Sequence, residues 1–288
     1  MMQGDILVRN SRLGILVFIV LAGYLPAKAE DPWLQFPRTP ALPPPERSGT
    51  LPVNGVRIWY AEFGSGTPVI LLHGGLANSN YWGLQVPALA QNNKVIVMDS
   101  RGHGRSTWDG GPISYHQMAE DVVGLMDGLH IPKAAVVGWS DGAIIGLDLA
   151  IHHPGRLTRL YAFAANSNTA GVKNPEGNGI FEAYKIRTRQ EYQKLSRAPQ
   201  KFNAFAKSLD QMWNTEPSFT DEQLCGIRVP TWIVDGDRDE LIKREDTDRM
   251  ARLIPGAGEL ILPRTSHFAF LQDPKQFNEA LLHFLSRP

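Results

Sequence analysis

The chain has 288 residues, of which 43% are hydrophobic and 20% are charged, and Cys225 is its single cysteine. These values are typical of a globular protein large enough for one α/β domain, and a single cysteine excludes an intrachain disulfide. The 29 basic and 29 acidic side chains balance, so composition gives no electrostatic reason to expect a nucleic acid or an anionic membrane as partner.

The first 29 residues have the pattern of a secretory signal peptide. Arg9 and Arg12 precede the apolar run 13–25, and an A-x-A cleavage site ends at Ala29. An uncleaved membrane anchor is the alternative, but this run is shorter than the ~20 residues needed to cross a bilayer. We therefore expect export to the periplasm or the medium, without stable membrane association after cleavage. Residues 30–50 are rich in proline and predict an extended tether.

Seven short segments after the tether are typical of strands. The first, 56–64, alternates between apolar and polar side chains, as a half-buried strand does. The others are continuous apolar runs ending in polar or glycine residues, which is typical of parallel strands covered by helices on both faces. These runs occupy residues 68–75, 94–102, 134–140, 157–166, 231–237 and 258–263.

Helical patterns alternate with these strands. Ser114 and Gln117 predict a capping box at the start of a helix that ends near residue 130. Residues 142–154 are apolar nearly all round, and Asp273 predicts the N-cap of a last helix. Strands alternating with helices predict an α/β fold with a doubly wound, mostly parallel sheet.

Residues 168–228 interrupt the alternation. They contain no strand-like run and predict a helical excursion over the carboxyl edge of the sheet, inserted before the penultimate strand. Its large apolar side chains either line a pocket or hold the excursion on the core, and the sequence leaves both possibilities open. These side chains are Phe202, Phe205, Met212, Trp213 and Phe219.

Residues 138–142 read Gly-Trp-Ser-Asp-Gly and join a predicted strand to a predicted helix. G-x-S-x-G in this context is a nucleophile elbow, in which Ser140 adopts an unfavourable backbone conformation and the glycines avoid clashes across the turn. The pattern alone occurs by chance, and serine is a poor nucleophile without a base.

His267 is the histidine best placed to be that base. It follows the last predicted strand, at the same sheet edge as Ser140. An acid that orients it is expected between them in the chain, where Asp235, still on the penultimate strand, is followed by Asp237 in the turn and by Asp239. We predict that Asp239 is this acid, because the loop at Asp239 can return toward His267. Asp237 is the alternative.

The other seven histidines are expected to have different roles. Two lie beside glycines in turns, and five lie on helices or at helix ends, where surface or capping roles are expected. These are His73 and His103, and His116, His130, His152, His153 and His283.

The backbone N–H groups of Gly75 and Asp141 are the candidate oxyanion donors, each typically worth ~3 kcal/mol. The alternative for residues 73–75 is an ordinary turn at the end of a strand. No metal or cofactor motif is found, since H-E-x-x-H, cysteine clusters and phosphate-binding glycine loops are all missing from the sequence. The residues expected to contact the substrate are Trp139, Met212, Trp213 and Phe268.

Five ordered pieces of the sequence resemble the α/β-hydrolase family. They are HGG at 73, DSRGHGRS at 99, GWSDG at 138, DGDRDEL at 235 and SHFAFLQDP at 266. The likeness covers residues 51–287 and is greatest for the serine-nucleophile branch that includes valacyclovir hydrolase and 3-oxoadipate enol-lactonase-like enzymes. It implies a hydrolase domain over 51–288, a cap over 168–228 and a pocket-side loop at 98–104. In the amino-acid-ester branch it also implies that the carboxylate of Asp141 helps to bind an ammonium group.

The expected activity is hydrolysis of a carboxylic ester, or a similar acyl bond, of a small molecule. Hydrolysis of a lactone or a carbon–carbon bond by the same three residues is the alternative within enzymes. A ligand-binding receptor with slow turnover is the alternative from another class, and a substrate panel separates the two.

Overall fold

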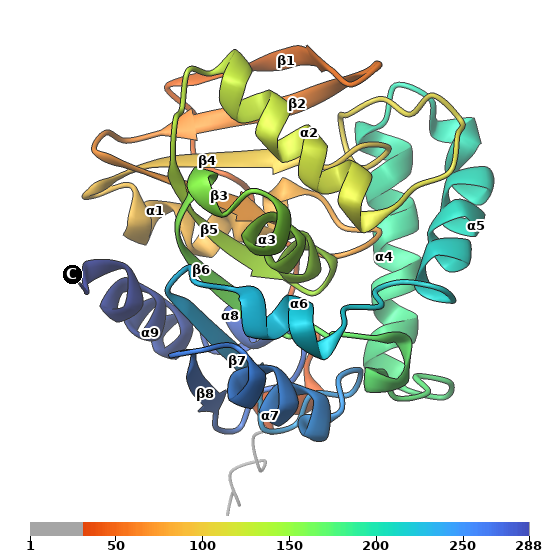
Figure 1. Cartoon of the computed structure of the whole chain (residues 1–288). Coiled ribbons are helices and arrows are strands. Elements are labelled where there is room, and N and C mark those ends of the chain that lie inside the picture. Colours follow the sequence, from red (N-terminus) through yellow and green to blue (C-terminus); the bar gives the residue numbers. More distant parts are fainter. Residues whose placement is uncertain (1–30, 288) are drawn as a thin grey trace, which may run out of the picture. The chain divides into compact units, whose positions relative to one another are not determined.

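The computed structural model describes residues 31–287, and the predicted signal peptide lies outside them. Within this range an eight-stranded sheet forms the centre, in the order β1-β2-β4-β3-β5-β6-β7-β8 (Figure 1). The strands are β1 (Arg47–Val53), β2 (Val56–Phe63), β3 (Thr67–Leu72), β4 (Asn93–Asp99), β5 (Ala134–Trp139), β6 (Leu157–Phe163), β7 (Thr231–Gly236) and β8 (Gly258–Leu262).

The sheet confirms the predicted fold class. β2 pairs antiparallel with β1 and with β4, and every other neighbouring pair is parallel. The seven predicted strands correspond to β2–β8, whereas β1 was not predicted. Its sequence, RSGTLPV, contains glycine and proline, which are tolerated because β1 is an edge strand.

Helices cover both faces of the sheet. The α-helices are α1 (Val86–Leu89), α2 (Tyr115–Gly128), α3 (Asp141–His152), α4 (Gly179–Leu195), α5 (Phe202–Trp213), α6 (Asp221–Gly226), α7 (Arg244–Leu253), α8 (Ala269–Gln272) and α9 (Pro274–Ser286). The 3₁₀ helices are η1 (Pro32–Leu34), η2 (Ser79–Leu84), η3 (Pro154–Arg156), η4 (Thr169–Gly171) and η5 (Pro199–Lys201). No helix within the described residues is both long and apolar enough to cross a lipid bilayer.

The continuous apolar runs have a simple cause, which β3 illustrates. Ile70 and Leu72 belong to the core shared with α2 and α3, while Val69 and Leu71 belong to the core shared with α1 and α9. Successive side chains of a strand point to opposite faces, so a strand covered on both faces needs apolar residues at every position.

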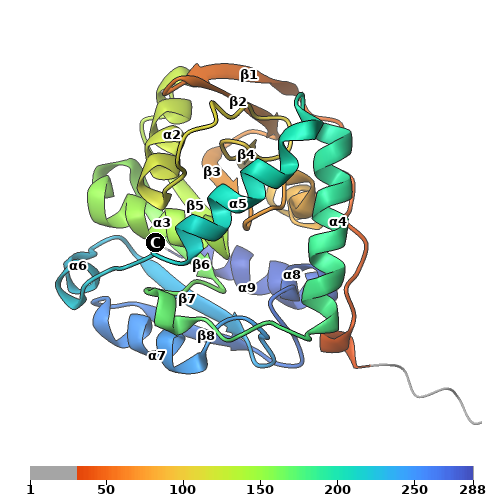
Figure 2. The ribbon, with the colours of Figure 1, turned by 90° about the vertical axis from the view of Figure 1, so that its right-hand side faces the viewer.

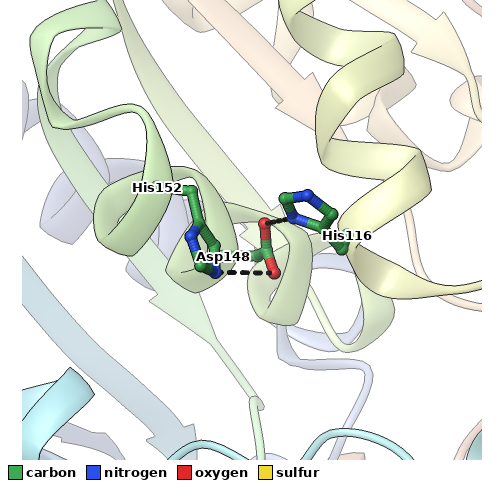
Figure 3. Close-up of side chains that lie close together, drawn as sticks. All are labelled: His116, Asp148 and His152. Atoms are coloured by element: carbon green, nitrogen blue, oxygen red, sulfur yellow. Dashed lines mark hydrogen bonds and ion pairs between the residues drawn. The ribbon is translucent and has the colours of Figure 1, made fainter.

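α2 and α3 lie side by side on one face of the sheet. The predicted N-cap of α2 is present, since Ser114 Oγ accepts a hydrogen bond of 3.1 Å from the N–H of Gln117. At their solvent side the two helices are joined by His116 of α2 and Asp148 of α3, with 3.0 Å between Nδ1 and Oδ1 (Figure 3).

The segment between β6 and β7 contains the predicted helical excursion, but its predicted end at residue 228 is too late. α4 and α5 cross the carboxyl edge of the sheet (Figure 2). In contrast, α6 packs against α3 and α7 in the body of the domain, with Leu224 fully buried. The cap therefore consists of α4 and α5 and ends before α6.

The prediction of a tether over residues 30–50 also needs correction. Residues 47–50 belong to β1, and the extended segment before them is bound to the domain. The ring of Phe36 packs on Phe268, with 4.7 Å between centroids, and the guanidinium of Arg187 on α4 lies 3.6 Å from the centroid of Phe36. Gln272 Nε2 donates a hydrogen bond of 2.8 Å to the carbonyl of Gln35. Proline content predicted the extended backbone but not these contacts.

Candidate active site

Ser140 stands on a sharp turn between β5 and α3. Its backbone angles, φ 54° and ψ −121°, are strained for a residue with a side chain. A Cβ at Gly138 would lie 2.3 Å from the carbonyl oxygen of Gly142, and a Cβ at Gly142 would lie 2.2 Å from that of Leu72. The predicted clash across the turn is therefore confirmed for Gly138, whereas Gly142 is required by the close approach of the end of β3.

Asp239 and His267 meet beyond the ends of β7 and β8. Asp239 Oδ2 lies 2.7 Å from Nδ1 of His267. The other carboxylate oxygen accepts hydrogen bonds from the N–H groups of Leu241 (2.6 Å) and Ile242 (2.7 Å), which hold it in place. With Nδ1 on the carboxylate, Nε2 of His267 is the nitrogen left for another partner.

Burial and pairing act in opposite directions on this pair. Burial alone would lower the pKa of His267, but the charge and hydrogen bond of Asp239 outweigh it and hold that pKa above its usual value. Burial alone would raise the pKa of Asp239, but His267 outweighs it and holds that pKa below its usual value. Pairing thus favours an ionised Asp239 and stabilises the imidazolium form of His267.

Asp237, the alternative acid, lies elsewhere. Its side chain is 32% exposed, and its Oδ1 accepts a hydrogen bond of 3.2 Å from the N–H of Thr265. The geometry favours Asp239 as the partner of His267.

Two more carboxyl groups surround this pair, and neither was predicted to take part. Glu240 Oε2 accepts a hydrogen bond of 3.1 Å from the N–H of His267. Asp235 is buried beside Asp239 and accepts a hydrogen bond of 3.1 Å from Thr247 Oγ1. Burial, followed by the charge of Asp239, raises the pKa of both Asp235 and Glu240.

A cavity at the carboxyl edge of the sheet has Ser140 and His267 in its wall, and both predicted oxyanion donors, Gly75 and Asp141, line it as well. Asp141 is the first residue of α3, so its N–H has no acceptor within the helix. Gly75 is held on both sides: its carbonyl accepts a hydrogen bond from the Tyr184 hydroxyl, and the next N–H, that of Leu76, donates to His103 Nε2 at 3.1 Å. The loop around Gly75 is therefore fixed by the cap and by a buried imidazole.

His73 and His103 are structural residues of this region. His73 Nε2 accepts a hydrogen bond of 3.0 Å from the N–H of Ser100, and its Nδ1 lies 2.8 Å from the carbonyl oxygen of Gly74. Burial lowers the pKa of His73, and burial together with the nearby His73 lowers that of His103. Both rings are thus held neutral as acceptors for backbone N–H groups, a role that glycine-rich turns did not reveal.

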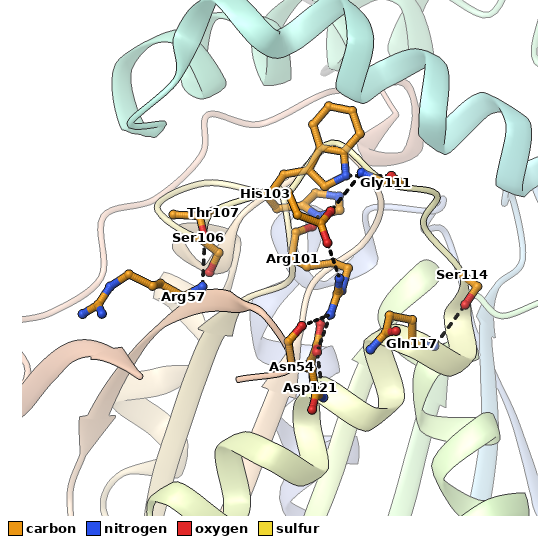
Figure 4. A network of polar contacts seen from close by, with 12 residues as sticks. Asn54, Arg57, Arg101, His103, Ser106, Thr107, Gly111, Ser114, Gln117 and Asp121 are labelled. Atoms are coloured by element: carbon orange, nitrogen blue, oxygen red, sulfur yellow. Dashed lines mark hydrogen bonds and ion pairs between the residues drawn. The ribbon is translucent and has the colours of Figure 1, made fainter. Parts of the chain in front are cut away.

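The loop at 98–104 supports the pocket from outside it. Arg101 donates two hydrogen bonds, of 2.6 and 2.7 Å, to the carboxylate of Asp121 on α2, and Asn54 Nδ2 donates a third of 3.1 Å (Figure 4). His103 packs edge-on against Phe205 of α5, with 4.7 Å between centroids. The expected pocket-side position is wrong, since none of these loop residues lines the cavity.

The side chain of Asp141 lies at the cavity wall beneath the cap. Its Oδ1 accepts a hydrogen bond of 2.9 Å from the Tyr115 hydroxyl of α2, and its Oδ2 accepts one of 3.0 Å from the Trp213 indole of α5. Burial raises the pKa of Asp141 to about 6, although both donors oppose the shift. The carboxylate therefore joins three helices, and the implied contact with an ammonium group stays a prediction.

The cavity has a volume of about 1100 Å³ and contains Ser140 and His267 in its wall. Of the predicted substrate contacts, Trp139 and Trp213 line it. Met212 and Phe268 do not, because they face the two hydrophobic cores. Consecutive residues of a helix point to different sides, so Trp213 lines the cavity while Met212, one residue earlier, faces the core. The sequence did not distinguish these two directions.

Other lining residues were not predicted as substrate contacts. The cap contributes the aromatic rings of Phe181, Tyr184 and Phe202, and the loop after β7 contributes Leu241 and Ile242. Phe202 was noted in the sequence as either a pocket or a core residue, and it contacts both.

Comparison with known proteins identifies relatives over most of the chain. Residues 69–280 match the model of the Alpha/beta hydrolase family. A putative carbamate hydrolase, RutD, of Azorhizobium caulinodans is 28% identical over 257 residues, which span 79% of this chain and 94% of the relative. The human serine hydrolase BPHL is 27% identical over 257 residues, 83% of this chain and 86% of the relative.

A solved structure is also similar to this chain over most of its length. The structure of Est816, described as an N-acyl homoserine lactone degrading enzyme, is 28% identical and superposes with a TM-score of 0.67, covering 82% of this chain and all of that one (100%).

Proposed function

This chain belongs to the alpha/beta hydrolase family, and we propose that it is a serine hydrolase that cleaves carboxylic esters or similar acyl bonds of small molecules. In this proposal Ser140 is the nucleophile, His267 the general base and acid, and Asp239 the acid that orients His267. The mechanism needs neither a metal ion nor an organic cofactor.

The reaction proceeds through an acyl-enzyme. His267 Nε2 removes the proton of the Ser140 hydroxyl while Oγ attacks the acyl carbon. The N–H groups of Gly75 and Asp141 donate hydrogen bonds to the resulting oxyanion, at the positive end of the α3 dipole. His267 then gives its proton to the leaving alcohol, and a water molecule activated by the same nitrogen releases the carboxylic acid.

One observation carries this proposal. The buried pair formed by Asp239 and His267, 2.7 Å apart, orients a base that lines the same cavity as a serine in a strained backbone conformation. Strain at a residue of this kind is characteristic of functional sites.

Labelling with a fluorophosphonate probe tests the nucleophile. The parent protein should be labelled, and Ser140→Ala should not be. Ser286→Ala is the control, because Ser286 is an exposed residue at the end of α9 and its loss should leave labelling unchanged. Labelling that persists in Ser140→Ala would show that another residue is the nucleophile.

A series of p-nitrophenyl esters tests the substrate class. The cavity is large and partly aromatic, so kcat/KM should rise as the acyl chain lengthens from acetyl to hexanoyl. Each buried methylene is worth about 0.8 kcal/mol, or up to about fourfold in kcat/KM. A flat series would mean that the acyl chain does not enter the cavity.

Hydrolysis of a lactone or a carbamate is the second candidate, since Est816 is described as degrading N-acyl homoserine lactones and RutD as a putative carbamate hydrolase. An ester, an N-acyl homoserine lactone and a carbamate should be compared at equal concentration, and the largest kcat/KM identifies the class. Tight binding with turnover far below ~1 s⁻¹ on all three would instead favour a receptor.

We further propose that the protein is exported. The support is the pattern of basic residues, a short apolar run and an A-x-A site before residue 30. N-terminal sequencing of the protein from the extracytoplasmic fraction should begin at Glu30, whereas an intact N-terminus would contradict cleavage.

A further inference from the structure

A cluster of two imidazoles and a carboxylate lies on the face of the sheet covered by α2 and α3, and the proposed reaction does not use it. It consists of His116 of α2 with Asp148 and His152 of α3 (Figure 3). Asp148 and His152 are four residues apart and therefore share one face of α3. α3 is also the helix that begins at Asp141, directly after Ser140.

The three side chains converge on one point. One ligand atom from each lies within 4.8 Å of the others. His116 Nδ1 is 3.0 Å from Asp148 Oδ1, His152 Nε2 is 3.8 Å from Asp148 Oδ2, and the two rings are 4.8 Å apart. Asp148 is held between the imidazoles, and its side chain is only 6% exposed.

These separations approach those around a bound transition metal. Zn²⁺ binds imidazole nitrogen at ~2.0–2.1 Å and carboxylate oxygen at ~2.0–2.2 Å, so tetrahedral ligand atoms lie roughly 3.4 Å apart. The ligand atoms lie within 4.8 Å of one another, so the widest separation must close by up to about 1.4 Å, which rotation of an exposed imidazole provides. His116 and His152 have that freedom, since their side chains are 55% and 40% exposed.

The surroundings leave space for an ion and its remaining ligand. A cavity of about 220 Å³ lies over the cluster and is also lined by Glu216 and Gln223. Two imidazoles and one carboxylate, with an open position for water, favour Zn²⁺ and its neighbours in the first transition row over Mg²⁺ or Ca²⁺, which prefer oxygen ligands.

We propose that His116, Asp148 and His152 form a binding site for a divalent transition-metal ion, Zn²⁺ in the first instance. The ion joins α2 to α3, the helix that follows the proposed nucleophile Ser140, and stabilises the folded domain. It lies outside the cavity that contains Ser140, since none of its three ligands lines that cavity. It therefore takes no direct part in the reaction.

Calorimetric titration with ZnCl₂ tests the site. The protein should carry no histidine tag, should be freed of metal with EDTA, and should be studied near pH ~7.5, where most imidazoles are neutral. One ion per chain is expected to bind, and His116→Gln and His152→Gln should each weaken binding roughly tenfold or more. At a zinc concentration ten times the dissociation constant, Tm should rise by about 3–5 °C.

Two controls make the result specific. His153 follows His152 in the chain, and its Nε2 pairs with Glu120 (2.6 Å) rather than with Asp148. The His153→Gln variant should therefore bind zinc as the parent does. Mg²⁺ should produce neither a binding isotherm nor a rise in Tm. The proposal is overturned if the parent shows no saturable zinc binding, or if His116→Gln and His152→Gln bind as tightly as the parent. Both substituted residues are exposed, so loss of folding is not expected to obscure the comparison.

Discussion

Asp239 Oδ2 lies 2.7 Å from His267 Nδ1, and the side chain of each residue is only 2% exposed. The residues are 28 positions apart in the chain and follow adjacent strands, β7 and β8. A buried carboxylate with hydrogen bonds to the backbone on one oxygen and to an imidazole on the other has little freedom to reorient. This pair makes the proposed function testable at the level of single atoms.

Asp239→Asn should lower kcat by about 10⁴ without loss of folding, because the amide favours the wrong tautomer of His267. Asp237→Asn is the matched control: it makes the same chemical change two residues away, at a side chain that does not contact His267, and should leave kcat within about twofold of the parent. The measurement is kcat of both variants and the parent, from steady-state kinetics with one ester as substrate. The opposite ranking would identify Asp237 as the orienting acid.

The pH profile should report His267 directly. The base acts in its neutral form, so kcat/KM should fall as the pH decreases through a pKa that Asp239 holds above the usual value of about 6.5. In Asp239→Asn this acidic limb should move to lower pH, because the carboxylate that stabilises the imidazolium is lost. A limb that stays in place in that variant would mean that another group titrates. The Asp237→Asn profile should match the parent.

Gly142→Ala should prevent the elbow from forming. The added Cβ would lie 2.2 Å from the carbonyl oxygen of Leu72, which is backbone and has no room to move. We expect a loss of at least about 3 kcal/mol in the free energy of unfolding, measured by urea denaturation, together with loss of probe labelling. Gly155→Ala, where a Cβ meets no atom within 4 Å, should change stability by less than about 1 kcal/mol. Equal effects at the two positions would contradict the steric explanation.

Asp141→Asn should change how stability depends on pH. Burial raises the pKa of Asp141 to about 6, against ~3.9 for an exposed aspartate. Between these values the folded state binds a proton that the unfolded state does not, so the contribution of this group to stability falls as the pH rises from about 4 to about 6.

Asparagine does not ionise, so this dependence should be absent from the variant. Relative to the parent, its free energy of unfolding should increase by up to about 3 kcal/mol between pH ~4 and pH ~7. Urea denaturation of both proteins at several pH values measures the difference. A constant difference would mean that Asp141 ionises as an exposed aspartate does.

Local sequence determined the sheet class and the elements of the proposed site. Strands β3–β8 are recognisable because residues covered on both faces must be apolar at every position, and β2 is recognisable from its alternation of apolar and polar residues. The elbow is recognisable because Gly138 avoids a clash with Gly142 and Ala143, a few residues along the chain, whereas the close approach of Leu72 to Gly142 is a tertiary contact. Asp239 and His267 were predicted from their positions after neighbouring strands, since the carboxyl ends of parallel strands meet at one edge.

Apart from the pair of Asp239 and His267, only the tertiary structure decided which side chains meet across elements. It brought Phe36 onto Phe268, turned Met212 into the core while Trp213 lines the cavity, and placed Glu240 and Asp235 around the proposed acid and base. It also brought His116 to Asp148, which is 32 residues away. Periodicity tells which face of a helix or strand is buried, but the partner on that face depends on register and docking angle. Those are set by packing between segments that are distant in the chain, and no local pattern encodes them.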